Sequence, residues 1–414
     1  MTRRAPADRL DGLRLTRRSP AEVQGMIARF DAPARVRLAE FVSRHPYIED
    51  LMWSFPAAAH QLALDASFGD DYLRAKLVEA GLFLVTQGAP LTAISAGLSL
   101  PLWLRRLPPE AFRGPIPELP MDVSFGPRVA NHMPTEVAML SRWLRWIAAA
   151  NAAADADYAI WAAKIFQPVN ERGISGVGAL GLFAWASGRP DVEIGADFEE
   201  RFEMDLSLAS AIDRAHTWLN RLAFVVFDAP RLALAGPRMT VDGYTFVPLE
   251  TPDDFITEGR LMGNCVAECA ELVADGSRQI WSVRSADGQR VANIEVRLRA
   301  GSGGVPYMAQ AHGPRNCSIP GPCLRAVYAW LLEWPQQVGD LRERVVAASP
   351  ATCAVYRRLM MPYWREKGLM PWCPLNPAYD PFGEFRDCLA LFNAQSDRRR
   401  HAALRRRRRR FQRR

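Results

Sequence analysis

The spacing of apolar residues changes once along the chain, near residue 237, and this change limits the folds that the sequence can adopt. Before that point, apolar residues recur mostly every three or four positions, which is the spacing of one helix face. After it, short segments rich in β-branched and aromatic residues are joined by Asp242-Gly243 and Asp287-Gly288, which are typical of tight hairpin turns. Because helical and strand patterns are segregated, we predict an α+β fold with a mainly helical N-terminal domain.

Capping residues and prolines mark the helix boundaries of the first part. Ser19-Pro20 predicts a helix start, with serine as the cap and proline at the first helical position, and Asp31-Ala32-Pro33 predicts a break. Five prolines between Pro108 and Pro120 predict a connecting loop. Further helices are expected at 57–66, 70–86, 91–104, 134–165 and 199–221.

These patterns divide the chain into five predicted regions. They are a basic disordered N-terminus (1–19), a mainly helical domain (20–235), a small module of antiparallel sheet and helix (237–335), a helical extension (336–394) and an arginine-rich tail (395–414).

The longest uncharged stretch, Ala80 to Trp103, is long enough to suggest a membrane-spanning helix. Gly88-Ala89-Pro90 interrupts it, and lipid would not solvate its hydroxyl groups, so we predict two buried helices instead. The N-terminal segment carries charges where a secretory signal needs apolar residues, and seven cysteines make no disulfide framework. We therefore expect a cytoplasmic protein without a membrane partner.

The module after residue 237 reads as a succession of short elements. Met239–Val247 predicts a hairpin, and Thr251-Pro252-Asp253-Asp254 predicts a capped helix start. The elements that follow are a helix at Asn264–Ala274 and strands at Gln279–Arg284, Arg290–Leu298 and Val305–Ala311. A helix packed on an antiparallel meander is the simplest arrangement of these parts.

Four segments of this module, Glu258–Val266, Ile280–Arg284, Asn293–Val296 and Gln310–Asn316, resemble the core motifs of the PcfJ-like family in order and spacing. The resemblance covers about residues 240 to 330. The family is named for a protein encoded among conjugative-plasmid transfer genes and has no established molecular activity. The resemblance therefore implies a bacterial, mobile-element-associated protein and no particular reaction. This chain has Asn264 where the family commonly has a histidine before the cysteine.

Cys265 is the candidate nucleophile, because it lies at the predicted first turn of a helix, where backbone N–H groups favour a thiolate. His312 and Asn316 follow in the Cys, His, Asn order of papain-like hydrolases, and Gln310 is available as an oxyanion donor. The alternative is that Cys265 is a small buried hydrophobe, while Gln310 and Asn316 satisfy backbone groups. The sequence leaves both interpretations open.

Carboxylates form the second set of candidates. Asp253, Asp254 and Glu258 either make an acidic patch near the cysteine or, for the two aspartates, complement a helix start. Glu295 alternates onto the opposite face of its strand from Ile294 and Val296, where it either lines a polar groove or meets solvent.

Neither a metal nor a cofactor is predicted. The pairs Cys265-x3-Cys269 and Cys317-x5-Cys323 have poor spacing for a structural zinc site. Gly176-Val177-Gly178-Ala179-Leu180-Gly181 matches the dinucleotide fingerprint, but its surroundings look helical and no strand precedes it.

The final seventeen residues, Arg398 to Arg414, hold eleven arginines and no acid. The chain has a net charge of +7, so subtracting these eleven leaves −4 for the rest. Such a segment binds polyanions non-specifically, unless it is only a solvated tail. The predicted nucleic-acid contacts are Arg405, Arg406, Arg407, Arg408, Arg409 and Arg410.

Three functional hypotheses follow. The first is a nucleic-acid-binding accessory protein, the second a cysteine-dependent acyl-transfer enzyme or hydrolase, and the third a non-catalytic structural or interaction module.

Overall fold

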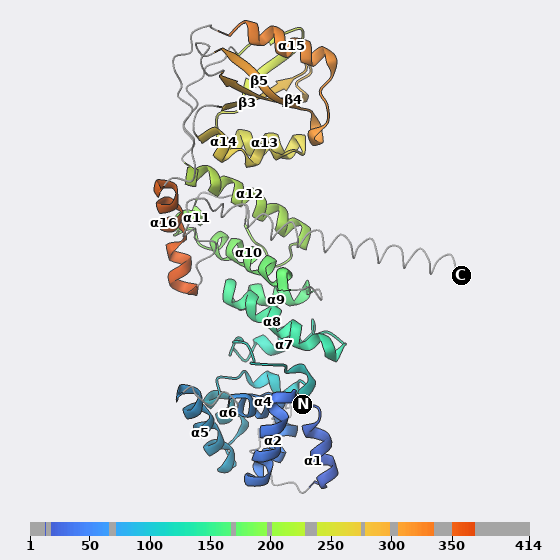
Figure 1. The fold of residues 1–414 in the computed structure, drawn as a ribbon, viewed down its shortest axis with the longest axis vertical. Coiled ribbons are helices and arrows are strands. Elements are labelled where there is room, and N and C mark those ends of the chain that lie inside the picture. Colours follow the sequence, from blue (N-terminus) through green and yellow to red (C-terminus); the bar gives the residue numbers. More distant parts are fainter. Residues whose placement is uncertain are drawn as a thin grey trace, which may run out of the picture. The chain divides into compact units, whose positions relative to one another are not determined.

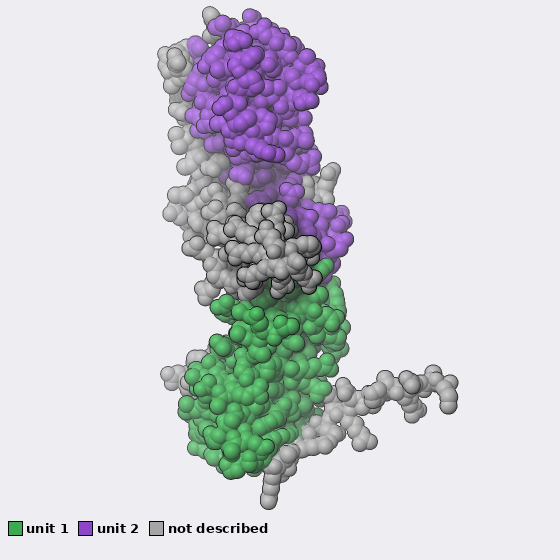
Figure 2. Space-filling view, turned by 90° about the vertical axis from the view of Figure 1, so that its right-hand side faces the viewer, with its two compact units in different colours: residues 1–182 green, residues 183–414 purple. Residues whose placement is uncertain are grey.

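A computed structural model describes residues 13, 18–65, 72–166, 171–196, 201–227, 238–274, 278–298, 305–334 and 350–368 (Figure 1). The chain divides into two compact units, residues 1–182 and 183–414 (Figure 2). The division falls inside the helix Glu171–Ser187. The predicted tail (395–414) lies outside the described residues, as does most of the predicted N-terminal region (1–19). The predicted α+β fold with a helical N-terminal part is confirmed.

The first unit starts with helices whose caps were predicted from the sequence. The Ser19 side chain accepts a hydrogen bond from the backbone of Glu22, whose carboxylate accepts one from Ser19 in return. Asp31 caps the second helix. These elements are α1 (Pro20–Ile27), α2 (Ala32–Arg44), α3 (Tyr47–Ser54) and α4 (Pro56–Asp65).

The uncharged stretch forms two helices whose predicted separation at Gly88, with a φ of 62°, is confirmed. The second helix ends at Gly97, before the predicted bound of 104, and the first is not buried as predicted, because Leu77 and Phe83 are exposed. No described helix is long and apolar enough to cross a membrane. The proline-rich segment at 108–120 contains one short 3-10 turn and otherwise no regular element, as expected for a connecting loop. The elements of this part are α5 (Tyr72–Thr86), α6 (Leu91–Gly97), η1 (Leu102–Arg106), η2 (Pro109–Ala111), α7 (Phe125–Ala130), α8 (Val137–Ala153), α9 (Ala156–Lys164) and α10 (Glu171–Ser187).

The second unit contains the predicted sheet and the helices around it. Its helices are α11 (Glu193–Ala196), α12 (Leu208–Phe227), α13 (Pro252–Met262), α14 (Ala270–Ala274), α15 (Gly321–Leu332) and α16 (Pro350–Lys367). α12 starts later than the predicted helix at 199–221, because residues 201–207 are not helical. α16 lies within the predicted helical extension.

The sheet is an antiparallel meander in the order β1-β2-β3-β4-β5. Asp242 and Gly243 both have positive φ, at 49° and 78°, and so form the tight turn that joins β1 to β2. The strands are β1 (Thr240–Val241), β2 (Tyr244–Pro248), β3 (Arg278–Arg284), β4 (Arg290–Leu298) and β5 (Pro306–His312). The predicted hairpin and strands are therefore confirmed.

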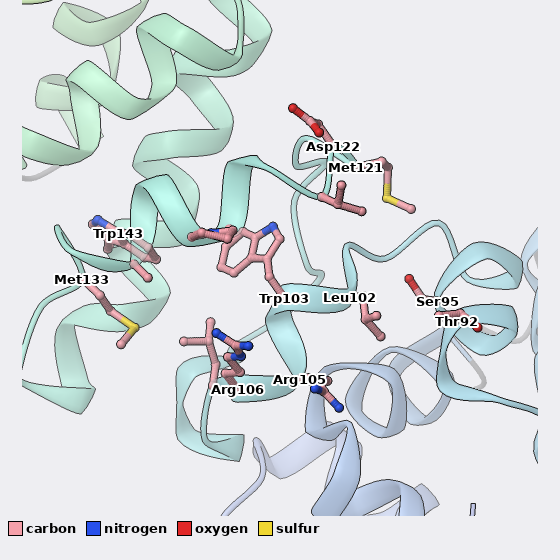
Figure 3. A pocket seen from close by; sticks show the side chains of 15 residues that line it. Thr92, Ser95, Leu102, Trp103, Arg105, Arg106, Met121, Asp122, Met133 and Trp143 are labelled. Carbon is pink, nitrogen blue, oxygen red and sulfur yellow. The ribbon is translucent and has the colours of Figure 1, made fainter. Parts of the chain in front are cut away.

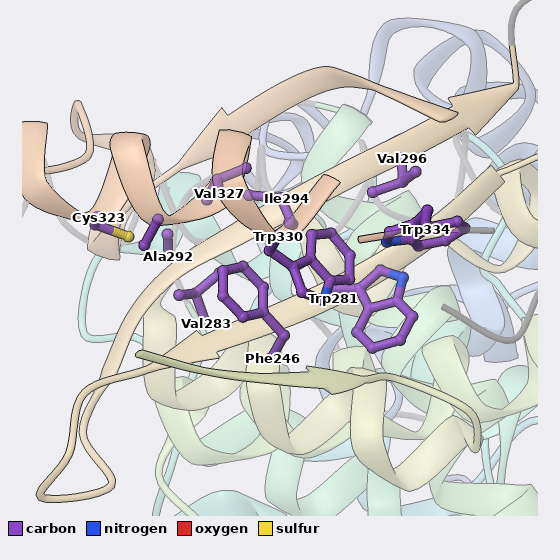
Figure 4. Close-up of a cluster of buried hydrophobic side chains, with 11 residues drawn as sticks. Phe246, Trp281, Val283, Ala292, Ile294, Val296, Cys323, Val327, Trp330 and Trp334 are labelled. Atoms are coloured by element: carbon purple, nitrogen blue, oxygen red, sulfur yellow. The ribbon is translucent and has the colours of Figure 1, made fainter. Parts of the chain in front are cut away.

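α15 covers one face of the sheet, and α13 and α14 lie on the other (Figure 1). The core under α15 is aromatic: Trp330 stacks on Phe246 with ring centres 4.5 Å apart and meets Trp281 and Trp334 edge-on (Figure 4). Full burial of one such side chain contributes about 1.5–3 kcal/mol. This core fixes which residues of β3 and β4 turn toward the opposite face.

The predicted continuous helix at Asn264–Ala274 is wrong. The segment forms a 3-10 turn, η3 (Cys265–Glu268), and then the separate short helix α14. Close packing against α13 accompanies the break, since a Cβ added at Gly259 would lie 2.8 Å from the backbone nitrogen of Ala267. Cys265 therefore begins a single tight turn, and fewer aligned peptide dipoles lie behind its thiol than predicted.

Candidate functional site

The sheet face opposite the aromatic core carries polar side chains from three strands. Asn293 pairs with Ser282 on one side and with His312 on the other, and Glu295 pairs with Gln310. Directly paired residues in a sheet point to the same face, so these side chains form one surface. We call this surface the polar face. Glu295 lies on it, while Ile294 and Val296 are buried in the core.

Glu258 of α13 is the central carboxylate of the polar face and is only 1% exposed. Arg290 Nε donates to Glu258 Oε2 at 2.7 Å, and Asn293 Nδ2 donates to Glu258 Oε1 at 2.8 Å. Asn264 Nδ2 donates to Asn293 Oδ1 at 2.6 Å. The Asn264 side chain in turn accepts the backbone N–H of Val266 at 3.3 Å. Hydrogen bonds thus connect the sheet, α13 and the start of η3.

Arginines surround both buried carboxylates. Arg290 and Arg284 approach Glu258 at 2.7 and 4.0 Å, and Arg297 and Arg278 approach Glu295 at 2.5 and 3.9 Å. These four arginine side chains are between 26% and 31% exposed. Four partly exposed guanidinium groups therefore lie around two buried carboxylates.

Cys265 is exposed and free, so the alternative of a buried hydrophobe is wrong for this residue. Cys269 is the buried member of the pair, and its Sγ lies 3.7 Å from the carbonyl oxygen of Cys265. His312 and Asn316 are also exposed. Within the described part of the chain, no hydrogen bond joins the Cys265 thiol to either side chain. The three residues are therefore accessible but not joined as a catalytic unit.

The loop after β5 has an unusual backbone. Arg315 and Asn316 are consecutive non-glycine residues with positive φ, at 55° and 59°. A Cβ built on Gly263, the residue that ends α13, would lie 3.4 Å from Arg315 Cγ, so this loop packs beside the start of η3. The described residues give the Gln310, Arg315 and Asn316 side chains no hydrogen-bond or acidic partner. Among the described residues, neither the Gln310 nor the Asn316 side chain satisfies a backbone group.

Comparison with known proteins finds no matching family model, curated protein or solved structure. The resemblance to the PcfJ-like family stays a prediction from the motifs.

The four motif segments nevertheless come together on the polar face. Glu258–Val266 supplies the end of α13 and the start of η3, and Ile280–Arg284 lies in β3. Asn293–Val296 lies in β4, and Gln310–Asn316 runs from β5 into η4 (Pro314–Asn316). Segments drawn from residues 258 to 316 thus border one surface, and this convergence makes the polar face the candidate functional site.

The structure also places the sequence patterns that were weighed as metal and dinucleotide motifs. No group of three or more His, Cys, Asp or Glu side chains among the described residues could hold a metal ion. Gly176 to Gly181 lies inside α10, and the strand-turn-helix geometry that a dinucleotide needs is therefore missing there.

The sequence predicts Glu258 only as part of an acidic patch and gives no indication of its contacts with Arg284 and Arg290 or of the Asn264–Asn293 pair. One signal was available for Glu258. It is three residues after Phe255 and four before Met262, so it lies on the buried stripe of α13. A charged residue in that position indicates a buried ionic partner.

Proposed function

We propose that this chain is a cytoplasmic, bacterial nucleic-acid-binding accessory protein, associated with mobile elements, that carries a PcfJ-like module at about residues 240 to 330. The observation that carries the proposal is the composition of Arg398 to Arg414, which holds eleven arginines and no acid. A segment of this charge gains affinity for phosphate backbones by releasing condensed counterions. The contact is independent of base sequence and weakens steeply as salt rises.

The polar face supports the same proposal with a second set of contacts. Arg315 is exposed beside it, and the described residues give its guanidinium no acidic partner. Gln310 and His312 are exposed on the adjoining edge strand β5. Amide, imidazole and guanidinium groups donate hydrogen bonds to phosphate and sugar oxygens and position a nucleic acid without reading its sequence.

The test is binding to a labelled DNA duplex and to a single-stranded RNA across a salt series from about 50 to 200 mM. The full chain is compared with a chain that ends at Asp397 and with a full-length variant whose Arg405 to Arg410 are glutamines. We expect both changes to weaken binding and to flatten the salt dependence. Equal binding by all three proteins would overturn the role of the tail.

Arg315→Ala tests the polar face, with Arg325→Ala as the matched control. Arg325 is an exposed arginine on α15, which covers the opposite face of the sheet. Loss of one phosphate contact should reduce the slope of log affinity against log salt by about one. We expect that reduction for Arg315→Ala and none for Arg325→Ala; the same slope for both variants would remove the polar face from the interface.

A cysteine-dependent enzyme is the second candidate function, and the exposure of Cys265 is the observation that favours it. A thiol nucleophile needs a base within about 2.6–3.2 Å in the reactive complex. The test is the rate of alkylation by iodoacetamide between about pH 6 and 9, with exposed Cys317 as the internal reference. Faster labelling of Cys265 that His312→Ala abolishes would favour the enzyme, and equal rates for the two thiols would dismiss it.

A further inference from the structure

The first unit contains a cavity of about 410 Å³ that no part of the proposed function uses. Residues of α6, η1, the segment at 121–123 and α7 line it, together with Met133 and with Trp143 of α8. Its volume lies in the range of sites for small organic molecules. Most of its wall is apolar, and the conspicuous side chains are Trp103, Trp143, Leu102, Met121 and Met133 (Figure 3).

Close packing holds the aromatic wall in place. Trp103 lies between Trp143 and Met133 on one side and Leu102 and Met121 on the other (Figure 3). Its ring is 6.4 Å from that of Trp143, edge-on at 82°. A Cβ added at Gly126 would lie 2.4 Å from the Cβ of Trp103, so α7 packs directly against this tryptophan. The wall therefore exists before any ligand binds.

Two cations line the cavity without acidic partners. Arg105 and Arg106 follow Trp103 within η1, and the described part of the chain supplies neither with an ion pair. Asp122 is the one carboxylate among the lining residues, and it already accepts the backbone N–H and the hydroxyl of Ser124 at 3.0 and 2.5 Å. The cavity therefore offers two guanidinium groups that no carboxylate among the described residues pairs with.

The two tryptophans face the cavity with their rings and not with their indole N–H groups. Nε1 of Trp103 and Nε1 of Trp143 are buried, and neither has a hydrogen-bond acceptor among the described residues. Buried indole N–H groups usually have a partner. The acceptor and charge preferences of the cavity therefore come from Arg105 and Arg106, which no carboxylate among the described residues pairs with, and its aromatic wall favours a ligand with a ring.

We propose that this cavity binds a small aromatic anion, whose carboxylate or sulfonate pairs with Arg105 and Arg106 and whose ring packs on Trp103. A planar carboxylate suits the forked geometry of a guanidinium group. Thioether sulfur atoms such as those of Met121 and Met133 make favourable contacts with aromatic ring edges. The inference concerns the first unit alone and is independent of the proposed binding of nucleic acid.

The probe is 8-anilino-1-naphthalenesulfonate, an aromatic sulfonate that becomes fluorescent in apolar surroundings, titrated into the full chain. N-phenyl-1-naphthylamine, which has the same rings without the charge, is titrated in parallel. For Arg105→Gln/Arg106→Gln we expect the sulfonate to bind at least about tenfold more weakly and the neutral probe to bind within about threefold of its original affinity. Arg37→Gln/Arg44→Gln is the control, because it removes two charges from α2, where both arginines pair with Glu40.

Ala130→Phe locates the binding site. Ala130 is exposed at the end of α7 but lines the cavity, so a phenyl group there fills the space without replacing a buried residue. We expect both probes to lose saturable binding while circular dichroism and the thermal midpoint stay unchanged. The proposal is overturned if the full chain binds neither probe saturably. Unchanged binding by Ala130→Phe, or equal losses in the two double-arginine variants, would also overturn it.

Discussion

Glu258 is the residue on which the polar face depends most directly. Its carboxylate is 1% exposed and accepts hydrogen bonds from Arg290 and Asn293. Glu258→Ala would leave both donors without their acceptor in a mostly buried position. Removal of one partner from a buried ion pair costs about 3–5 kcal/mol. Because the Arg290 side chain is 26% exposed and can turn toward water, we expect a loss of about 2–4 kcal/mol in the free energy of unfolding.

Urea denaturation followed by circular dichroism measures this loss. Glu250→Ala is the control, because Glu250 forms a surface pair with Arg238 in which the two side chains are 50% and 62% exposed. Such pairs contribute about 0–1 kcal/mol. Equal losses for the two variants would mean that the Glu258 network contributes no more than a surface ion pair.

His60 makes the stability of the first unit sensitive to acid. It is fully buried, its ring stacks on Phe30 at 6.5 Å, and its Nε2 lies 2.9 Å from the carbonyl oxygen of Gly114. Burial lowers the pKa of His60 below its ordinary value of 6.5, although the hydrogen bond to Gly114 and the nearby Asp31 and Asp65 raise it in part. The folded state therefore favours the neutral ring.

Stability from this group is fully present above about pH 6.5 and is lost as the pH falls toward the lower pKa of the folded state. We expect the free energy of unfolding of the first unit to fall between about pH 7.5 and 5.5, and His60→Gln to reduce that slope. His312→Gln is the control, because His312 is exposed. Urea denaturation at three pH values gives the slope; identical slopes for the two variants would show that another group is responsible.

At the scale of elements, Arg315→Gly tests the strained loop after β5. A non-glycine residue in the left-handed region costs roughly 1–2 kcal/mol, and glycine relieves that cost. Against this, glycine loses more conformational freedom on folding than other residues do, which costs about 0.5–1 kcal/mol relative to alanine. We therefore expect a net stabilisation of about 0.5–1 kcal/mol in urea denaturation. Arg315→Ala removes the same side chain but keeps the positive φ of 55°, so it should not stabilise.

The elements that the sequence predicted well are those set by local chemistry. The capping box of Thr251 and Asp254, the turn at Asp242 and Gly243 and the bounds of β4 all follow from residues a few positions apart. The break in the predicted helix at Asn264–Ala274 does not follow from nearby residues in the sequence. It accompanies the close contact between Gly259 and Ala267. That contact belongs to tertiary packing and leaves no periodic signal in the sequence.

In the candidate site, too, the sequence predicted the features that depend on neighbouring residues and missed the contacts between distant ones. Alternation along β4 predicted that Glu295 turns away from Ile294 and Val296, and it does. The bond between Glu258 and Asn293 joins residues 35 positions apart, and no local pattern specifies which carboxylate meets which amide. The sequence gives the order of the four motif segments along the chain. It does not show that their polar side chains lie on one face, because the folded sheet brings them together.

The whole molecule is electrically asymmetric. The net charge is +7, of which the last seventeen residues contribute eleven positive charges, so residues 1–397 carry −4. The body as a whole therefore does not attract a polyanion, and any strong affinity for nucleic acid must depend on the tail or on a local patch such as the one beside Arg315.

Replacement of Arg405 to Arg410 by six lysines distinguishes charge from guanidinium chemistry, because it keeps the net charge at +7. Counterion release depends on the number of cations, whereas bidentate contacts to bases or phosphates need the forked guanidinium group. If the tail acts by charge alone, the dissociation constant for duplex DNA should stay within about threefold and the salt slope should not change. Fluorescence anisotropy over the salt series measures both quantities. An unchanged slope with affinity weaker by about tenfold or more would instead mean that the tail makes specific guanidinium contacts, and the proposed non-specific anchor would have to be replaced by an arginine-recognition element.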